Sequence, residues 1–392
     1  MPCGSCVRGV FDVPDGVEPR PDHILQEASR ILFVENPSGI DLLVKANLLY
    51  SPATDMFWME IINGPPPSLL EMLNSSFGFW GDEKLFSWKY SQYPGYKDEH
   101  CYHVVDEDKV AAFTRLYAKE LTDGRKVHIW GDTLVDRGYR GKGIYSTLKE
   151  MEKKRSAEAD LMMTFNTKYK IPYHVHLKDG WEFRELPLYI KIQDPAKVLN
   201  SYLEEGLRNS PWLKRGLDSL GLVLDIDGEH VCLSEVTNMK IPVKRSLVDG
   251  LIKLFSSGGS LETDEKVEHG DEGEVESLFR NMSAKGFKRD PEDVYHILSY
   301  PYIEDVLTVK DKGFAVIGRF PREDIVELRV LDMMYSDTST YNALIDAMDS
   351  GDSVLMMSSV APPGWVRVRN RVVMWDPAFG SFHMPVSIYD MV

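Results

Sequence analysis

Hydrophobic and polar positions alternate in short runs along the first part of the chain. Four such runs predict β-strands, at residues 56–62, 102–105, 110–117 and 127–135. Asp123-Gly124 predicts a tight turn between the last two runs. After the first run, Ser68 can cap a helix, because apolar residues follow it at helical spacing. The order predicts a strand, a helix and then an antiparallel meander.

The most informative stretch follows the fourth run. Residues 135–143, Val-Asp-Arg-Gly-Tyr-Arg-Gly-Lys-Gly, form a basic turn rich in glycine, and a helix is predicted after it because Ile144, Leu148 and Met151 share one face. A strand that ends in such a turn presents free backbone N–H groups and the positive end of the helix dipole. We expect it to bind pyrophosphate. It is neither a dinucleotide fingerprint nor a P-loop, and a helix start with solvated basic side chains is the alternative.

Composition and charge narrow the function classes. The chain has 392 residues, of which 43% are hydrophobic, and this length and composition favour a globular protein of two or three domains. Its formal net charge is −16 at pH 7, which repels phosphate backbones and anionic membranes. We therefore expect neither nucleic acid nor membrane as a partner. Arg137, Arg140 and Lys142 form a local basic cluster in the predicted phosphate-binding turn.

Cysteine usage indicates the compartment. Four cysteines are too few and too scattered for a disulfide framework, and the sequence contains no signal-like segment and no apolar run of about 18 residues. A cytoplasmic protein is the prediction. Cys3 and Cys6 have the spacing of a redox or half-metal site, but no second ligand pair lies at zinc spacing. Two ordinary thiols are the simpler interpretation, and no metal is expected.

The glycine-rich turn resembles the acetyl-CoA motif of the GCN5-related N-acetyltransferases, the GNAT superfamily. That motif, Gln/Arg-x-x-Gly-x-Gly/Ala, is similar to residues 140–145, Arg-Gly-Lys-Gly-Ile-Tyr. Residues 161–165 resemble the next strand of the family, residues 180–181 its later Gly-Phe/Trp element, and residues 86–94 a stretch of larger GNAT proteins. The resemblance covers roughly residues 56–192. It implies an α+β fold, a mixed and mostly antiparallel sheet flanked by helices.

The resemblance also implies which residues bind the cofactor. In the family, amides of this turn hold the pyrophosphate of acetyl-CoA, and the pantetheine arm pairs with the end of the preceding strand. Tyr145 departs from the usual Gly or Ala, which affects how closely the pyrophosphate approaches the last amide. Acetyl-CoA is the expected cosubstrate, and an amine-bearing small molecule, protein or peptide is the expected acceptor. The implied binding residues are Val135, Arg140, Gly141, Lys142, Gly143, Ile144, Tyr145 and Asn166.

The catalytic groups follow from the same resemblance. The acidic general base of the family lies eight residues before the motif arginine, which is Asp132 in this sequence. A carboxylate inside a half-buried strand needs a partner or a role, and a hydrogen bond to turn amides or Thr133 is the structural alternative. The general acid, a tyrosine in the family, falls on His176, with Tyr173 one helical turn earlier as a rival. Two histidines at residues 174 and 176 also allow metal ligation, but further ligands are lacking; the terminal carboxylate of Val392 is another candidate base, as in some multi-domain relatives.

The second half of the chain repeats the order of elements of the first. The predicted elements are a helix, three strands, a helix and a strand, at residues 274–282, 306–309, 313–319, 325–331, 339–348 and 353–357. Residues 332–337, Asp-Met-Met-Tyr-Ser-Asp, replace the glycine-rich turn and carry no positive charge. Such a turn would repel a pyrophosphate, so we expect a second, degenerate GNAT-like unit that is structural or that shapes a substrate cleft.

Two softer features mark the boundaries of the units. Small and then acidic residues from 255 to 275 predict a linker or long loop, and a strand-like run stops near residue 193. A hairpin is predicted around residues 225–228. The predicted division is an N-terminal extension, a GNAT domain, a middle segment with the linker, and a degenerate GNAT-like domain, at residues 1–55, 56–194, 195–258 and 259–392.

We therefore expect an N-acetyltransferase in which a primary amine attacks acetyl-CoA directly, with base and acid assistance. A non-catalytic CoA-binding or partner-binding module of the same fold is the alternative, which the departures at Tyr145 and His176 keep open. An aminoacyl- or long-chain acyltransferase is a third possibility, since those families also double the GNAT fold. The sequence does not indicate the acceptor or the oligomeric state.

Overall fold

The computed structural model describes most of the chain between residues 44 and 382. The predictions for Cys3 and Cys6, for residues 1–43 and for the terminal carboxylate of Val392 lie outside the described residues. Among the described helices, none combines the length and the apolar character that a membrane crossing requires. The described residues are 44–48, 57–77, 80–106, 108–168, 170–208, 222–226, 229–232, 239–259, 261, 263–282, 286–320 and 324–382.

The first half of the chain forms the predicted strands and helices in the predicted order. Asp82 begins α3 by accepting hydrogen bonds from the backbone N–H groups of Lys84 and Leu85, at 3.1 and 3.0 Å. We call this set of elements the N-terminal unit. It comprises β1 (Val44–Leu48), β2 (Phe57–Asn63), α2 (Leu69–Phe77), α3 (Glu83–Lys89), β3 (Cys101–Asp106), β4 (Lys109–Glu120), β5 (Lys126–Val135), α4 (Ile144–Arg155), β6 (Leu161–Thr167), α5 (Ile171–Lys178) and β7 (Glu182–Ile192).

The second half repeats this order and forms the C-terminal unit, which confirms the predicted tandem fold. Its two predicted helices and four predicted strands are present, and a long final strand, β16, follows them. The turn predicted at residues 332–337 is shorter than expected, because β14 continues to Tyr335. The elements are β11 (Glu268–His269), α9 (Glu272–Asn281), α10 (Pro291–Leu298), β12 (Ile303–Val309), β13 (Gly313–Phe320), β14 (Glu327–Tyr335), α11 (Thr338–Ala347), β15 (Ser353–Met357) and β16 (Val366–Trp375).

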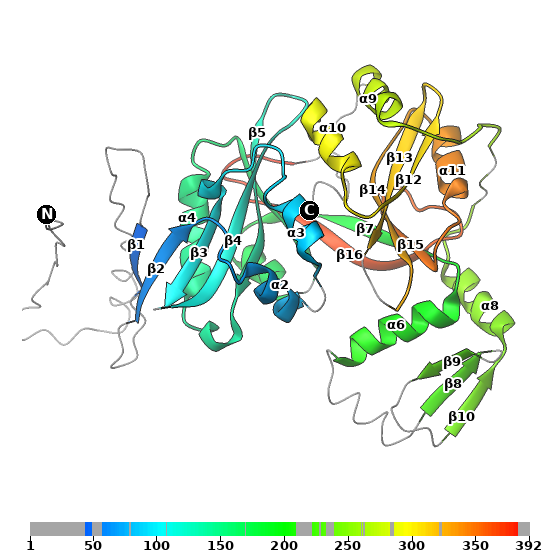
Figure 1. Ribbon diagram of the computed structural model, residues 1–392, viewed down its shortest axis with the longest axis horizontal. Helices are drawn as coiled ribbons and strands as arrows, with labels where there is room; N and C mark the ends of the chain where they lie inside the picture. Colours follow the sequence, from blue (N-terminus) through cyan, green and yellow to red (C-terminus); the bar gives the residue numbers. More distant parts are fainter. Residues whose placement is uncertain are drawn as a thin grey trace, which may run out of the picture.

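Both units contribute to one continuous sheet. Among the described residues, thirteen strands pair in the order β1-β2-β3-β4-β5-β6-β16-β7-β15-β14-β13-β12-β11. Figure 1 shows the N-terminal strands at one end of this sheet and β12 to β15 at the other, with β7 and β16 between them. The result is a mixed α+β fold with helices packed along the sheet.

The two units exchange their last strands at the centre of the sheet. β7 follows β6 and α5 in the chain, but it pairs with β15 and β16, and the neighbour of β6 is β16. Val372 and Val373 of β16 stand opposite Asn166 and Phe165 of β6. Each unit therefore completes the sheet of the other. The predicted boundaries at residues 194 and 259 stay predictions.

The middle segment lies beside the C-terminal unit (Figure 1). The hairpin predicted around residues 225–228 is confirmed, because β8 (Leu222–Ile226) and β9 (Glu229–Cys232) pair antiparallel. The segment also contains α6 (Pro195–Arg208), β10 (Met239–Val243) and α8 (Arg245–Phe255). The stretch predicted as a linker is held to the C-terminal unit, since Ser257 N–H donates to the carbonyl of Trp365 at 2.8 Å.

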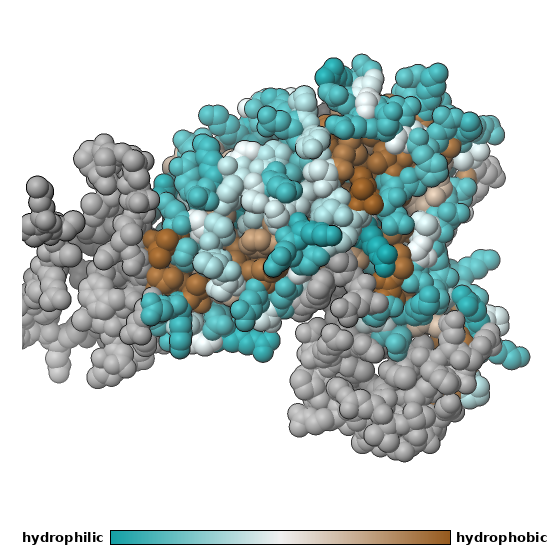
Figure 2. Space-filling view, in the orientation of Figure 1, coloured by the Kyte–Doolittle hydropathy of each residue, from teal (hydrophilic) through white to brown (hydrophobic). Residues whose placement is uncertain are grey.

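Two hydrophobic cores support the elements that matter for function. One lies beneath α4 and joins Ile144, Leu148 and Met151 to Trp130 of β5 and Met374 of β16. The other lies between the units and packs buried side chains of α3 against α10 and β13, including Leu85, Trp88, Val294, Ile297 and Phe314. Outside the cores, hydrophilic residues cover most of the described surface on the face that Figure 2 shows, with small hydrophobic patches among them.

Candidate functional site

Strands β5 and β6 part from each other next to the glycine-rich turn. They pair in parallel from Val127↔Leu161 to Trp130↔Thr164, and β5 then continues to Val135 without pairing to β6. Along these last residues β5 keeps its partner on the other side, β4. The end of β5 therefore offers a free backbone edge, which is the part of the sheet where the pantetheine arm was predicted to pair.

The predicted pyrophosphate turn is open. It contains a short 3₁₀ turn, Arg137–Tyr139, and ends at Gly143, which is the N-cap of α4 and makes no side-chain capping bond. Gly141 and Gly143 have φ values of 82° and 78°, which side chains other than glycine rarely adopt. A Cβ atom at either glycine would have no neighbouring atom within 4 Å. The space in front of the helix N-terminus is therefore free for an anionic group.

The basic side chains of the turn lie around this space. Arg140 is exposed, and its Nε donates to the carbonyl oxygen of Val135 at 3.1 Å. The ammonium of Lys142 lies 4.8 Å from the centre of the Tyr139 ring. These contacts, the uncapped helix and the two left-handed glycines fit the phosphates of a CoA cofactor. Tyr145 lies on the first turn of α4 and is half-buried.

Asp132 occupies a bulge in β5. Phe113 pairs with Leu134 and Arg115 with Gly131, so that β4 has one residue, Thr114, opposite both Asp132 and Thr133. Asp132 has a φ of 52°, in the left-handed region. Its side chain points to the α3 side of the sheet, where it accepts three hydrogen bonds.

The three donors to Asp132 come from α3 and β4. Lys89 Nζ lies 2.9 Å from Oδ1, and the hydroxyls of Tyr90 and Tyr117 lie 2.9 and 2.6 Å from Oδ2. Burial by itself raises the pKa of Asp132, but the charge of Lys89 and the bonds from Tyr117 and Lys89 outweigh it and lower the pKa. Asp132 is therefore a stable carboxylate whose two oxygens already accept three hydrogen bonds.

A buried cation extends this cluster. The Arg115 side chain is 1% exposed, and its guanidinium lies 4.2 and 4.6 Å from the ring centres of Tyr117 and Tyr90. Its Nη1 donates to the carbonyl oxygen of Lys89 at 2.7 Å. The cluster of Lys89, Tyr90, Arg115, Tyr117 and Asp132 thus ties the end of α3 to the bulge. This favours the structural interpretation of Asp132, although its predicted partners, the turn amides and Thr133, are not the ones found.

His176 lies on α5, away from the Asp132 cluster. It is 4% exposed, its Nε2 lies 3.3 Å from the hydroxyl of Tyr145, and its ring centre lies 4.2 Å from that of Trp181. Burial, together with the nearby charge of Lys149, lowers the pKa of His176 to about 3, although the charge of Asp179 opposes the shift. The imidazole is therefore neutral near pH 7. This argues against the predicted role, which requires a histidine that donates a proton near neutral pH.

The remaining predicted residues occupy different surroundings. Tyr173 is 4% exposed and belongs to the core beneath α4, with its ring against Phe183. His174, its neighbour in the sequence, is exposed, and the described residues include no group of three or more potential metal ligands. Asn166 lies on β6 and directs its amide to the sulfur of Met374 at 3.6 Å. No described hydrogen bond joins Asp132 to His176 or Tyr173.

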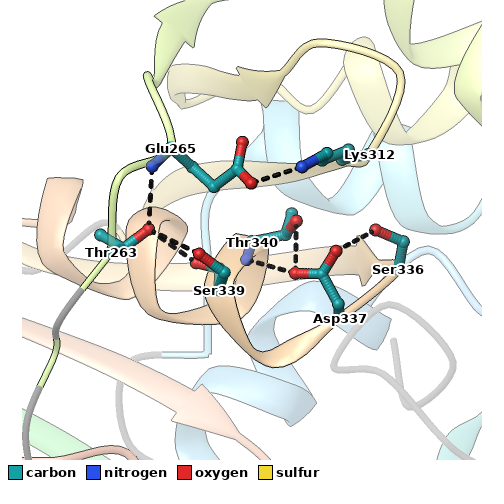
Figure 3. A network of polar contacts seen from close by, with 7 residues as sticks. All are labelled: Thr263, Glu265, Lys312, Ser336, Asp337, Ser339 and Thr340. Carbon is teal, nitrogen blue, oxygen red and sulfur yellow. Dashed lines mark hydrogen bonds and ion pairs between the residues drawn. The ribbon is translucent and has the colours of Figure 1, made fainter.

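The C-terminal unit shows what the same site looks like when it is closed. Only two residues, Ser336 and Asp337, connect β14 to α11, whereas residues 136–143 connect β5 to α4. Asp337 caps α11, because its Oδ1 accepts from the backbone N–H and the hydroxyl of Thr340, at 2.8 and 3.0 Å (Figure 3). Thr263, from the predicted linker, bonds to Ser339 on the same turn. A carboxylate thus fills the position that an anionic cofactor would need.

Sequence reasoning missed several residues near the open site. Lys89, Tyr90 and Tyr117 lie far from the turn in the sequence, and no local pattern connects them to Asp132. Glu152 is different: it follows Ile144 and Leu148 at spacings of eight and four, so it lies on the apolar face of α4. A carboxylate on the apolar face of a helix could have been recognised in the sequence as a candidate functional group, and in the structure Glu152 is 4% exposed.

Comparisons with known proteins agree with this geometry. Residues 67–161 match the model of the Acetyltransferase (GNAT) family. The chain is similar in structure to the N-myristoyltransferase of Saccharomyces cerevisiae, solved with myristoyl-CoA and inhibitors. The likeness covers 95% of this chain and 96% of the N-myristoyltransferase, with a TM-score of 0.51 and 10% identity. A second likeness, to a GCN5-related N-acetyltransferase from Kribbella flavida, covers 80% of this chain and 70% of that protein, with a TM-score of 0.46 and 14% identity. No curated protein matches the chain.

The family match lies on the open half of the molecule. It begins just before α2 and ends at the start of β6, and so contains the bulge, the glycine-rich turn and α4. The likeness to N-myristoyltransferase extends over both units and shows the same overall fold. Residues 67–161 thus match the GNAT acetyltransferase family in sequence, and the fold of the chain is a pair of GNAT-like units.

Proposed function

We propose that the protein is an acyl-CoA-dependent N-acyltransferase that transfers an acetyl group from acetyl-CoA to a primary amine. The observation that carries the proposal is the open N-terminus of α4. Two left-handed glycines, an uncapped helix and the free edge of β5 lie together there, while Asp337 closes the equivalent position of the C-terminal unit. The family match supports acyl-CoA as the donor.

The chain's own residues would divide the work as follows. The amides from Gly141 to Tyr145 would hold the pyrophosphate, since the Arg140 N–H donates to the carbonyl of Arg137 at 3.4 Å. The free edge of β5 up to Val135 would pair with the pantetheine arm. Holding the thioester in this way leaves its carbonyl carbon open to the amine, and positioning of the two reactants supplies much of the rate. Acetyl-CoA itself supplies the activated acyl group.

The first test is binding. The melting temperature should rise with the concentration of acetyl-CoA, and titration calorimetry should give one site per chain. A second step follows the release of the CoA thiol from acetyl-CoA in the presence of a panel of primary amines and peptide N-termini. If acetyl-CoA and CoA both leave the melting temperature unchanged at every concentration, the proposal is wrong.

Two observations favour a second candidate, a non-catalytic module that binds CoA. Asp132 accepts three hydrogen bonds and has a lowered pKa, and His176 is buried and neutral, so neither of the two groups expected to move protons is poised to do so near pH 7. Binding of acetyl-CoA without thiol release for any amine in the panel would favour this candidate.

A longer donor acyl group is a third candidate. It is favoured by the likeness to a solved N-myristoyltransferase that holds myristoyl-CoA, which covers nearly the whole chain. Calorimetry with acetyl-, octanoyl- and myristoyl-CoA distinguishes the two donors, because a site for acetyl-CoA should bind all three through the nucleotide with similar affinity. A clear gain in affinity with chain length would favour the long-chain donor.

A further inference from the structure

A chain of hydroxyl groups crosses the sheet next to the bulge. The hydroxyl of Thr114 on β4 lies 2.7 Å from Oε1 of Glu152 on α4 and 2.8 Å from the hydroxyl of Thr133 on β5. Glu152 is 4% exposed and Thr114 is fully buried, whereas Thr133 is half-buried. The hydroxyl chain therefore leads from the partly open end of β5 to a carboxylate beneath α4.

The direction of these hydrogen bonds is determined by simple counting. Thr114 has one hydroxyl hydrogen, which it donates to the carboxylate of Glu152, so the bond between the two threonines must be donated by Thr133. The oxygen of Thr133 then has a lone pair free to accept a further hydrogen bond. The hydroxyl chain is oriented to accept a proton at Thr133 and deliver a proton to Glu152.

Thr133 lies where the proposed reaction needs a proton acceptor. It is three residues beyond Trp130, the last residue of β5 that pairs with β6, and two residues before Val135. The thioester of a donor paired along this free edge would lie beside it. Asp132, the adjacent residue, directs its side chain to the opposite face of the sheet, toward Lys89 and Tyr90.

The C-terminal unit serves as an internal control. β5 ends at Val135, which pairs with Ala112, and β14 ends at Tyr335, which pairs with Gly313. If the two strands are aligned at these ends, Asp332 takes the position of Asp132. Asp332 is buried, whereas Asp132 is half-buried, and it also meets a cation, Arg289, at 3.3 Å. Asp332 pairs with Val316 next to a bulge at Leu331, so the closed unit keeps a carboxylate beside a bulge. A feature that both units share belongs to the fold rather than to the chemistry of one of them.

The hydroxyl chain, in contrast, is confined to the open unit. The same counting places Met333 and Ala315 at the positions of Thr133 and Thr114. The buried residues of α11 are Thr340, Tyr341, Ala343, Leu344 and Ile345, none of which is a carboxylate. The hydroxyl chain therefore occurs together with the open turn and is missing from the unit whose turn is closed.

We propose that Glu152, reached through Thr114 and Thr133, accepts the proton that the amine loses during acyl transfer. This inference rests on the proposed function. The amine nitrogen forms a bond to the thioester carbon, the carbon–sulfur bond breaks, and the CoA thiolate leaves with the electron pair. The surplus proton on nitrogen passes to Thr133, the proton of Thr133 to Thr114, and the proton of Thr114 to the Glu152 carboxylate. Glu152 and Thr114 act through Thr133 and do not touch the substrate.

The electrostatic surroundings of Glu152 suit this role. Burial raises the pKa of Glu152 to about 7, while the hydrogen bond from Thr114 and the charge of Lys149 oppose the rise. Among the described residues, the ionisable groups that interact with it are Lys149 and Tyr145, both on α4, and β4 presents only the hydroxyl of Thr114. A group with this pKa can accept a proton above pH 7 and return it to solvent.

The test compares pH profiles of kcat/KM for release of the CoA thiol from acetyl-CoA, with the best amine of the panel, between pH 5.5 and 9. We expect Glu152→Gln to lower kcat/KM about a hundredfold or more at pH 8 and to abolish the decrease that the wild type shows below about pH 7. The titration of the amine is the same for every variant, so the difference between profiles belongs to the protein. Glu150→Gln, at an exposed position of α4, is the matched control.

Variants of the relay and of the rival carboxylate complete the experiment. Thr133→Val should lower kcat/KM with little change in the Kd of acetyl-CoA. Thr133→Ser, which keeps the hydroxyl group, should keep kcat/KM near that of the wild type. Asp132→Asn should retain the decrease below pH 7. The inference is overturned if Glu152→Gln keeps both the rate and the profile of the wild type, or if Asp132→Asn abolishes the decrease instead. A wild type that binds acetyl-CoA but turns over no amine overturns both this inference and the proposed enzyme, whereas turnover that survives in Glu152→Gln overturns only the relay.

Discussion

The two GNAT-like units arrange a strand, a helix and a parallel strand in the same way, but they treat the start of the helix differently. In the N-terminal unit, eight residues with two left-handed glycines connect β5 to α4 and leave the helix uncapped. In the C-terminal unit, two residues connect β14 to α11, and Asp337 caps the helix. The comparison shows that the fold by itself does not leave the amides at the start of the helix free. That takes a turn that is long enough and whose side chains are small enough.

The units agree in another respect, a carboxylate at or beside a strand bulge, half-buried in Asp132 and buried in Asp332. Asp132 meets Lys89, and Asp332 meets Arg289. We expect Asp132→Asn and Asp332→Asn both to destabilise the protein, each by about 3 kcal/mol or more, because each removes the carboxylate that forms an ion pair with a largely buried cation. Urea unfolding at pH 7 measures this effect, the largest that we expect. A loss confined to Asp132→Asn would show that the two bulges are not equivalent.

The buried Glu152 belongs to the N-terminal unit, and it should make the free energy of unfolding depend on pH. The folded-state pKa of Glu152 is about 7, above its ordinary value of 4.5, so the folded protein holds a proton that the unfolded chain has released between these pH values. Stability should therefore fall as the pH rises from about 4.5 to about 7, by on the order of 3 kcal/mol. Relative to the wild type, Glu152→Gln should become more stable across this range in urea titrations. Glu150→Gln, an exposed neighbour, should follow the wild type; a Glu152→Gln profile parallel to the wild type would contradict the raised pKa.

The open turn can be closed by one substitution. Gly143→Leu should weaken the binding of acetyl-CoA about a hundredfold or more, equivalent to about 2.7 kcal/mol, because the side chain enters the space in front of the helix amides. Titration calorimetry provides the measurement. Gly124→Leu is a matched control, since Gly124 also has a positive φ and free space around it but lies in the exposed turn between β4 and β5. Equal binding by the two variants would mean that the turn does not hold the cofactor.

The reverse change tests whether the closed site can be opened. Asp337→Gly removes the cap of α11 and should cause a small loss of stability, the smallest of these effects. We expect no second binding site for acetyl-CoA, because the connection between β14 and α11 remains two residues long. Calorimetry at high acetyl-CoA concentration checks the number of sites. A second site in Asp337→Gly would show that the capping carboxylate alone closes the C-terminal unit.

Much of the fold was predictable from local patterns, with clear exceptions. The alternating runs gave β2 to β5 and β12 to β15, and the glycine-rich turn predicted the start of α4, because these signals depend on neighbours along the chain. β16 was not predicted, and its position between β6 and β7 depends on pairing with residues about 200 positions away. Of the predicted site, Gly141 and Gly143 adopt the left-handed conformation in the turn before α4, and their role in binding stays a prediction. Asp132 and His176 lie in buried clusters whose other members come from distant elements.

The sequence by itself determined the order of elements, the repeat of that order and the contrast between a glycine-rich and an acidic turn. Each is a property of a few consecutive residues, for which backbone conformation and local charge suffice. The tertiary structure alone decided which strands complete each unit and what surrounds each carboxylate. Burial, hydrogen-bond partners and therefore pKa values depend on groups that only folding brings together. That is why Asp132 accepts three hydrogen bonds from distant elements, whereas Glu152, which the sequence places on an apolar helix face, lies at the end of a hydroxyl chain.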